Sequence, residues 1–153
     1  MKIRASVSIA ISGLVWFNTY VSSAQPNKEL YELQERCGKR AAELFKRDYG
    51  RPVYKSQLGV GSFKYVNHYS AHLNKCFFIL IHVFYPKDKK GLSSTTRTLF
   101  ELNNNKEYGK YFKPIYDDDN VSSTCQVQDK VCRSEDEWRQ LVKPFMCISQ
   151  NLI

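Results

Sequence analysis

The ten-residue run from Cys76 to Tyr85 constrains the fold more than any other segment, because it is apolar on both faces of an extended strand. One face would carry Phe77, Ile79, Ile81 and Val83, and the other would carry Phe78, Leu80, His82 and Phe84. A strand that is apolar on both sides belongs in the middle of a sheet. The run therefore predicts a central strand that is covered on one side by a helix.

The segment that precedes this run has the spacing of an amphipathic helix. Apolar residues recur every three or four positions at Leu30, Leu33, Cys37, Ala41 and Leu44. Asn27 suits an N-terminal cap and Gly50 suits a C-terminal stop, so we expect a helix from Asn27 to about Tyr49. Its apolar face would pack on the central strand.

Three more segments have the composition of strands: Phe63–His72, Leu92–Leu102 and Lys106–Ile115. Gly109 is a candidate for a β-bulge in the last of them. Residues 50–61 contain Pro52 and several glycines and are expected to form a loop. Short polar turns separate the strands, which favours antiparallel pairing of consecutive strands. The sequence predicts an α+β fold, with the N-terminal amphipathic helix packed on an antiparallel sheet of about four strands.

The C-terminal part predicts a small disulfide hairpin followed by a short helix. If Gln128 and Asp129 form the turn, Cys125 and Cys132 face each other about 5.5 Å apart at Cα, which suits a disulfide. Ser134 and Glu137 match a helix capping box. Apolar residues then follow at helical spacing from Trp138 to Phe145, and Pro144 limits the length of this C-terminal helix.

Residues 1–24 have the features of a cleavable secretory signal peptide. Lys2 and Arg4 precede an uncharged apolar stretch from Val7 to Val21, and small residues end at Ala24. The apolar stretch is shorter than the roughly 20 residues that span a bilayer, although a retained signal anchor is the rival interpretation. Cleavage would leave residues 25–153 as a single domain in the periplasm or outside the cell, with no other apolar run long enough to cross a membrane.

All five cysteines lie after the leader, which favours disulfides over metal or redox chemistry in an exported protein. Cys37 lies on the apolar stripe of the helix and Cys76 begins the central strand, so a bond between them would tie the helix to the sheet. With Cys125 bonded to Cys132, Cys147 would remain a free thiol or bridge to a partner chain. Other pairings are possible from the sequence alone.

The residues that could support chemistry form no recognised site. His68, His72 and Cys76 have a metal-like spacing, but in a strand the two histidines would lie about 13 Å apart. Asp117–Asn120 lacks the ligand spacing and glycine of an EF-hand loop. The chain contains no motif of a serine hydrolase, a zinc protease or a phosphate-binding loop. We therefore expect no catalytic residue, no metal and no cofactor, and we lean against an enzyme.

The positive charge of the chain has two interpretations, attraction to anionic partners and an ordinary soluble surface, and the sequence favours the second. The formal net charge is +8, or +6 without Lys2 and Arg4, and basic residues are spread over the whole chain. If the charge serves binding, an envelope protein or an anionic polymer is the expected partner. Aromatic and basic residues alternate at Phe63-Lys64-Tyr65, as on nucleic-acid platforms, but nucleic acid is not the expected partner of an exported protein.

Several short segments resemble those of small exported bacterial proteins of unknown function. They are Glu35–Lys39, Leu73–Phe77, Asn105–Gly109 and the stretch from Glu137 to Phe145. The resemblance would extend over most of the mature chain, about residues 30–146. The resemblance implies a bacterial envelope setting and carries over no activity. In that setting the glycosylation sequon at Asn120 would have no role.

The leading functional hypothesis from the sequence is a non-catalytic binding or inhibitor-like module of the periplasm or extracellular space. One alternative is a small envelope hydrolase that acts on cell-wall or surface glycans. A clustered pair of carboxylates, or a histidine beside a carboxylate, in a deep cleft would favour it. Another alternative is a structural protein that is linked to its partner through Cys147.

Overall fold

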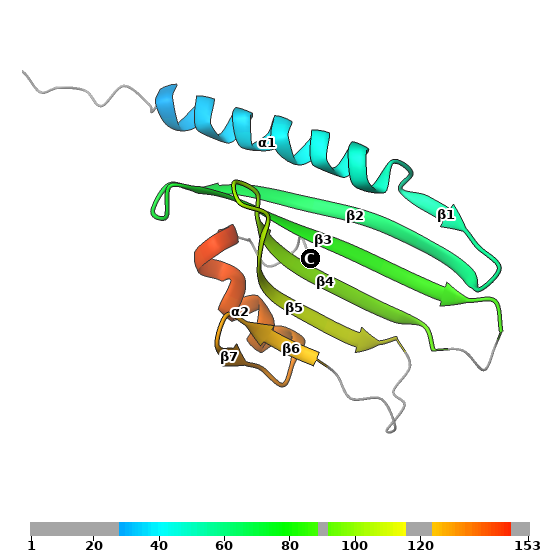
Figure 1. Cartoon of the computed structure of the whole chain (residues 1–153). Helices are drawn as coiled ribbons and strands as arrows, with labels where there is room; N and C mark the ends of the chain where they lie inside the picture. Colours follow the sequence, from blue (N-terminus) through cyan, green and yellow to red (C-terminus); the bar gives the residue numbers. More distant parts are fainter. Residues whose placement is uncertain (1–27, 89–91, 116–123, 148–153) are drawn as a thin grey trace, which may run out of the picture.

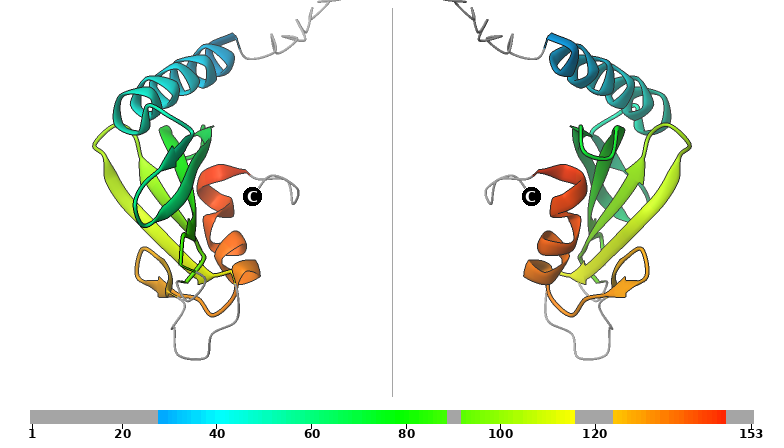
Figure 2. Two further views of the ribbon diagram at one scale, coloured as in Figure 1. Left: turned by 90° about the vertical axis from the view of Figure 1, so that its right-hand side faces the viewer. Right: turned by 90° about the vertical axis from the view of Figure 1, so that its left-hand side faces the viewer.

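A computed structural model describes residues 28–88, 92–115 and 124–147. Two helices pack on opposite faces of one antiparallel sheet (Figures 1 and 2). The elements in chain order are α1 (Lys28–Tyr49), β1 (Val53–Lys55), β2 (Gly59–Ser70), β3 (Lys75–Pro86), β4 (Ser94–Glu101), β5 (Lys106–Pro114), β6 (Thr124–Val127), β7 (Lys130–Val131) and α2 (Glu135–Met146). The leader and Asn27 lie outside the described residues.

The sheet has seven strands rather than the expected four or so, and their spatial order follows the chain order from β1 to β7. β1 is a three-residue strand inside the segment that was expected to be a loop, and it pairs with β2 through Val53 and Ser62. The disulfide hairpin of β6 and β7 is not a separate unit, because Cys125 pairs with Tyr111 of β5. The expected strand count was therefore too low at both edges of the sheet.

β3 is the central strand that the sequence predicts, and its two faces contribute to two separate cores. On one face, Phe78 and Leu80 pack with Cys37 and Ala41 of α1. On the other face, Phe77 and Ile79 pack with residues of α2 that include Trp138, Val142 and Phe145. Both faces of β3 are buried because α2 covers the side that α1 leaves open.

Each disulfide stabilises one side of this layered structure. Cys37 is bonded to Cys76, with 5.5 Å between the Cα atoms, and this bond joins α1 to the start of β3. Cys125 is bonded to Cys132, with 4.9 Å between the Cα atoms, across the β6–β7 hairpin. These are the pairs that the sequence favours. Cys147, directly after α2, is exposed and free.

Candidate functional site

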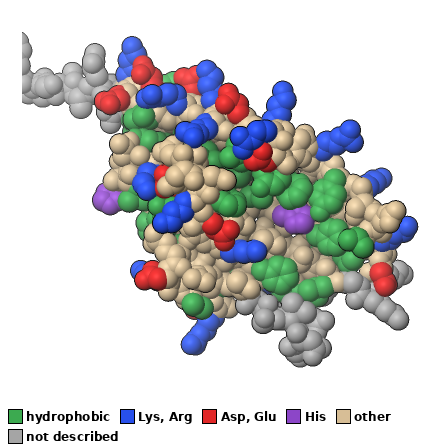
Figure 3. Space-filling model, viewed as in Figure 1, with side chains coloured by type: hydrophobic (Ala, Val, Ile, Leu, Met, Phe, Trp, Pro, Cys, Tyr) green, Lys and Arg blue, Asp and Glu red, His purple; other side chains and the backbone are tan. Residues whose placement is uncertain are grey.

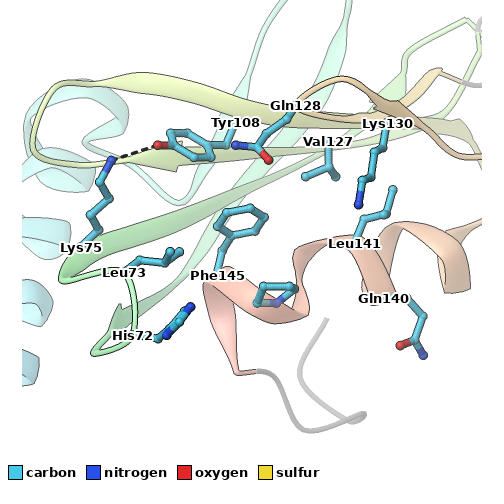
Figure 4. Close-up of a pocket in the computed structure, with 11 residues that line it drawn as sticks. His72, Leu73, Lys75, Tyr108, Val127, Gln128, Lys130, Gln140, Leu141 and Phe145 are labelled. Carbon is cyan, nitrogen blue, oxygen red and sulfur yellow. Dashed lines mark hydrogen bonds between the residues drawn. The ribbon is translucent and has the colours of Figure 1, made fainter.

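A cavity lies at the end of the sheet where β2 turns into β3, between this turn and α2. Its volume is about 500 Å³, within the usual range of roughly 300–1,000 Å³ for small-ligand pockets. Apolar groups form most of its wall: Leu73, Tyr108, Val127, Leu141, Pro144 and Phe145. The polar lining residues are His72, Lys75, Gln128, Lys130 and Gln140. Figure 4 shows that these side chains belong to the β2–β3 turn and the start of β3, to β5, to the β6–β7 hairpin and to α2.

The wall on the α2 side is positioned by the N-terminal cap of that helix. The Ser134 hydroxyl accepts a hydrogen bond of 3.1 Å from the backbone N–H of Glu137. The Glu137 carboxylate accepts one of 2.8 Å from the backbone N–H of Arg133, which completes the predicted capping interaction one residue early. Pro144 lies inside the last turn of the helix, where its ring lines the cavity. The helix continues beyond Pro144 to Met146.

A β-bulge brings the Tyr108 ring into the cavity wall. Leu99 pairs with Gly109 and Phe100 pairs with Glu107, which leaves Tyr108 as an extra residue on β5. The ring of Tyr108 meets the ring of Phe145 edge-on at a centroid distance of 5.5 Å. The sequence predicts a bulge at Gly109, and the structure has it next to that residue.

Behind Tyr108 lies a buried carboxylate that is already paired. The Glu101 side chain is 3% exposed, and its carboxylate accepts hydrogen bonds from the Lys75 ammonium at 2.8 Å and from the Tyr108 hydroxyl at 3.2 Å. Burial acts to raise the pKa of Glu101, but the hydrogen bond and charge of Lys75, together with Tyr108, hold this pKa below its usual value. Glu101 is therefore an ionised structural partner of Lys75 and does not act as an acid at neutral pH.

Gln128 occupies a strained position on the rim of the cavity. It is in the two-residue turn between β6 and β7, and its φ angle of 53° lies in the left-handed region that glycine prefers. Its backbone N–H donates a hydrogen bond to the Tyr108 carbonyl. Figure 4 shows the Gln128 side chain extending over the cavity toward Tyr108. A two-residue hairpin turn requires a positive φ at one or both of its central residues, so the turn imposes this strain on Gln128.

The cavity favours an anion over a cation. None of its described lining residues is acidic, whereas Lys75 and Lys130 are both basic. The charge of Lys75 is compensated by Glu101, but Lys130 forms no ion pair with any residue in ranges 28–88, 92–115 and 124–147. In Figure 4 the Lys130 side chain extends toward Leu141, so its ammonium group lies beside an apolar wall. An anionic group would meet Lys130 there.

The described residues of the cavity lining do not form the arrangement that hydrolysis of a glycan requires. Such a reaction uses two carboxylates about 5–10 Å apart on either side of the scissile bond. The described lining contains no carboxylate, and its histidine, His72, is not beside one. The described residues also contain no cluster of three or more metal-binding side chains.

The chain matches no protein-family model, no curated protein and no solved structure. A proposal for its function therefore rests on the sequence and on the geometry of the described residues. Neither α1 nor α2 is sufficiently apolar over a bilayer's thickness to span a membrane.

A second surface lies beside α1 on the face of the sheet shown in Figure 3, where hydrophobic side chains gather around a histidine. The half-buried rings of Tyr54, Phe63 and His82 lie nearly parallel there, and the Tyr54 hydroxyl is 2.9 Å from Nε2 of His82. Burial lowers the pKa of His82, which is therefore neutral at pH 7. Lys64, which is between Phe63 and Tyr65 in the sequence, pairs with Ile81 and lies on the opposite face.

The structure separates the other residues that sequence analysis considered as sites. His68 is in β2, whereas His72 is in the following turn, and Cys76 is in a disulfide. The acidic loop at Asp117–Asn120 and the sequon at Asn120 lie outside the described residues. The presence of Gln128 and Lys130 in the cavity lining was not predicted from the sequence. Gln128 at a turn position that normally favours glycine was the one available signal.

Proposed function

We propose that the protein is a non-catalytic binding module of the bacterial periplasm or extracellular space, and that the cavity between α2 and the β2–β3 turn is its ligand site. The observation that carries this proposal is a largely apolar cavity whose described lining contains no carboxylate and includes Lys130, a cation that no described residue compensates. Sites of this kind bind an apolar body and use a few polar groups to orient it.

The ligand class follows from the lining. An aliphatic or aromatic portion would pack against Leu141 and Phe145, where it would be removed from water. A carboxylate or phosphate at one end would pair with the Lys130 ammonium, and the Gln128 amide could donate a further hydrogen bond. The leader and the disulfides support the assignment to an oxidising compartment.

The probe that tests this proposal is decanoate below its micelle concentration, measured by calorimetry against two matched ligands. Acetate has the charge without the chain, and decyltrimethylammonium has the chain with the opposite charge. We expect saturable binding of decanoate alone. Lys130→Gln should weaken it about three- to five-fold, as expected for a partly exposed ion pair. Leu141→Asp should abolish it by adding a negative charge to the wall.

Lys143→Gln is the control variant, because Lys143 is an exposed residue of α2 that does not line the cavity. It should bind decanoate as the wild type does. Equal affinity of the wild type, Lys130→Gln and Leu141→Asp for decanoate would show that the cavity is not the site. Equal binding of decanoate and decyltrimethylammonium would contradict the assigned role of charge.

A further inference from the structure

The end of the sheet opposite the cavity carries an unusual group of exposed apolar side chains. Val53, Leu58, Val60 and Tyr85 are 55%, 77%, 40% and 51% exposed, respectively. They lie in and around the β1–β2 turn and the end of β3, at the right-hand end of the sheet in Figure 1. We call these four residues the apolar tip.

The four residues form one surface. Val60 pairs directly with Tyr85 of β3 and with Lys55 of β1, so these three side chains stand side by side on one face of the sheet. Val53 lies two residues before Lys55 on the same face. Leu58 is at the turn itself, and its carbonyl accepts a hydrogen bond of 2.8 Å from the backbone N–H of Lys87. The apolar tip therefore combines a sheet face with a protruding leucine.

Hydrogen bonds between its own residues stabilise the turn that contains Leu58. The backbone N–H of Ser56 donates to the Gly59 carbonyl at 2.9 Å, and the Ser56 hydroxyl accepts hydrogen bonds from the N–H groups of Leu58 and Gly59 at 3.2 Å each. Gly59 is required here because a Cβ atom at this position would lie 2.2 Å from the Tyr85 carbonyl oxygen. The hydrogen bonds fix an exposed leucine at the extremity of the molecule.

Basic residues surround the apolar tip. The segments 51–64 and 84–88 contain the basic residues Arg51, Lys55, Lys64 and Lys87 and the acidic residue Asp88. Lys55 lies next to Val60 because the two residues pair across β1 and β2. Lys64 is four residues after Val60 in β2, so it lies on the same face of the sheet as Val60. Lys87 follows the end of β3. An apolar tip with this surrounding charge is complementary to a surface that is apolar beneath an anionic layer.

We propose that the apolar tip docks on an anionic membrane surface, with Leu58 inserted among the lipid headgroups and Lys55 and Lys87 against lipid phosphates. Superficial membrane binding of this kind combines a small apolar insertion with electrostatic attraction to anionic lipid. A stable protein interface uses about 20–30 residues on each side, far more than the apolar tip provides. Pairing with a second copy through β1 is opposed by the length of that strand, three residues, and by the charge of Lys55 within it.

The experiment measures binding to vesicles of phosphatidylcholine alone and of phosphatidylcholine with 30% phosphatidylglycerol. The whole chain is expressed in cells that can export it, and all variants are compared at the same N-terminus, verified by mass. A leader that remains would then contribute equally to every variant. We expect partition to the anionic vesicles only, with a loss of affinity when the salt concentration is raised.

The variants separate the two contributions to binding. Leu58→Asp should lower the partition coefficient at least ten-fold. Lys55→Gln and Lys87→Gln should each lower it about five-fold, the effect of one lysine at an anionic surface. Val131→Asp is the matched control for the apolar change, because Val131 is also 77% exposed but lies on β7, the opposite edge strand of the sheet. It should not change the partition.

Three results would overturn the membrane proposal. One is equal binding to neutral and anionic vesicles, and another is an equal effect of Val131→Asp and Leu58→Asp. The third is a wild type that does not bind vesicles and forms a dimer in solution, which Leu58→Asp converts to a monomer. The apolar tip would then bind a second copy of the chain. None of these results bears on the decanoate site, since the cavity lies at the other end of the sheet.

Discussion

Replacing Gln128 by glycine should make the protein more stable while removing a side chain from the proposed ligand site. Gln128 has a φ angle of 53°, a conformation that costs an L-residue about 1–2 kcal/mol and costs glycine almost nothing. The glycine variant would also have a more flexible unfolded chain, which opposes this gain by about 0.4–1 kcal/mol. The net expectation is a free energy of unfolding that rises by about 0.5–1 kcal/mol.

Nothing else at this position should offset the gain. The Gln128 side chain is exposed, so little apolar burial is lost. Both hydrogen bonds that the structure assigns to Gln128 are made by its backbone, as donor to the Tyr108 carbonyl and as acceptor from the Gln126 side chain at 2.7 Å. A glycine retains both of them.

Urea unfolding, followed by circular dichroism and by the fluorescence of the fully buried Trp138, measures the change. Gln128→Ala is the informative companion variant, because it removes the side chain and keeps the strained backbone. Asn105→Gly is the control for the backbone, since asparagine tolerates its φ angle of 54° and little gain is expected there. Both Gln128 variants should bind decanoate more weakly, but only Gln128→Gly should be stabilised. A loss of stability in Gln128→Gly would refute the assignment of strain to this residue.

Three other predictions concern the buried groups and the free thiol. Removing the Cys37–Cys76 disulfide, which closes a loop between positions 39 apart, should lower the free energy of unfolding by about 4 kcal/mol, against about 2.5 kcal/mol for the Cys125–Cys132 bond with its separation of seven. Equal losses in urea titrations of the two double alanine variants would contradict the chain-entropy reasoning. Folding lowers the pKa of Glu101, so the ionised carboxylate stabilises the folded protein at any pH above the pKa of about 4.3 that Glu101 has in the unfolded chain. This stabilisation is lost as the pH falls through the pKa of Glu101 in the folded protein. Glu101→Gln should therefore be less stable than the wild type at pH 7, and their stabilities should converge in acid; a difference that does not depend on pH would count against the ion pair. Cys147 should react with a maleimide in the folded protein, and non-reducing electrophoresis should show whether it also links two chains; failure of the thiol to react in a chain that runs as a monomer would contradict its exposure.

The sequence predicted the elements whose buried faces follow from a periodic pattern of apolar residues. The alternation along β3 identifies its two faces, and the helical spacing from Leu30 to Leu44 identifies the face of α1 that packs on one of them. The placement of Cys37 on that face and Cys76 on the strand leads to the pair that the structure contains. In each case a periodic pattern determines which side chains share a surface.

The remaining features depend on contacts between distant segments. β1 is stabilised by its pairing with β2 and by the hydrogen bond of 2.7 Å from the Phe63 N–H to the Pro52 carbonyl, and a three-residue strand has no periodicity that could predict it. The cavity is formed by four separate segments. Gly109 marks the bulge in the sequence, but only the pairing of β4 with β5 shows that the bulge turns Tyr108 into the cavity wall. The pairing of Lys75 with Glu101 likewise joins residues from different strands. These arrangements arise only when the sheet is complete.

The spatial order of the strands has a consequence for when the cavity exists. Because each strand from β1 to β7 pairs with its neighbours in the chain, the sheet can assemble by successive local steps, each of which closes a short loop. Among the described elements α2 follows all the strands, and it supplies Trp138 to one core and Leu141 and Phe145 to the cavity. A ligand in the cavity would thus bind only the finished molecule and shift the folding equilibrium toward it. The stability of the protein should therefore rise with the concentration of its ligand.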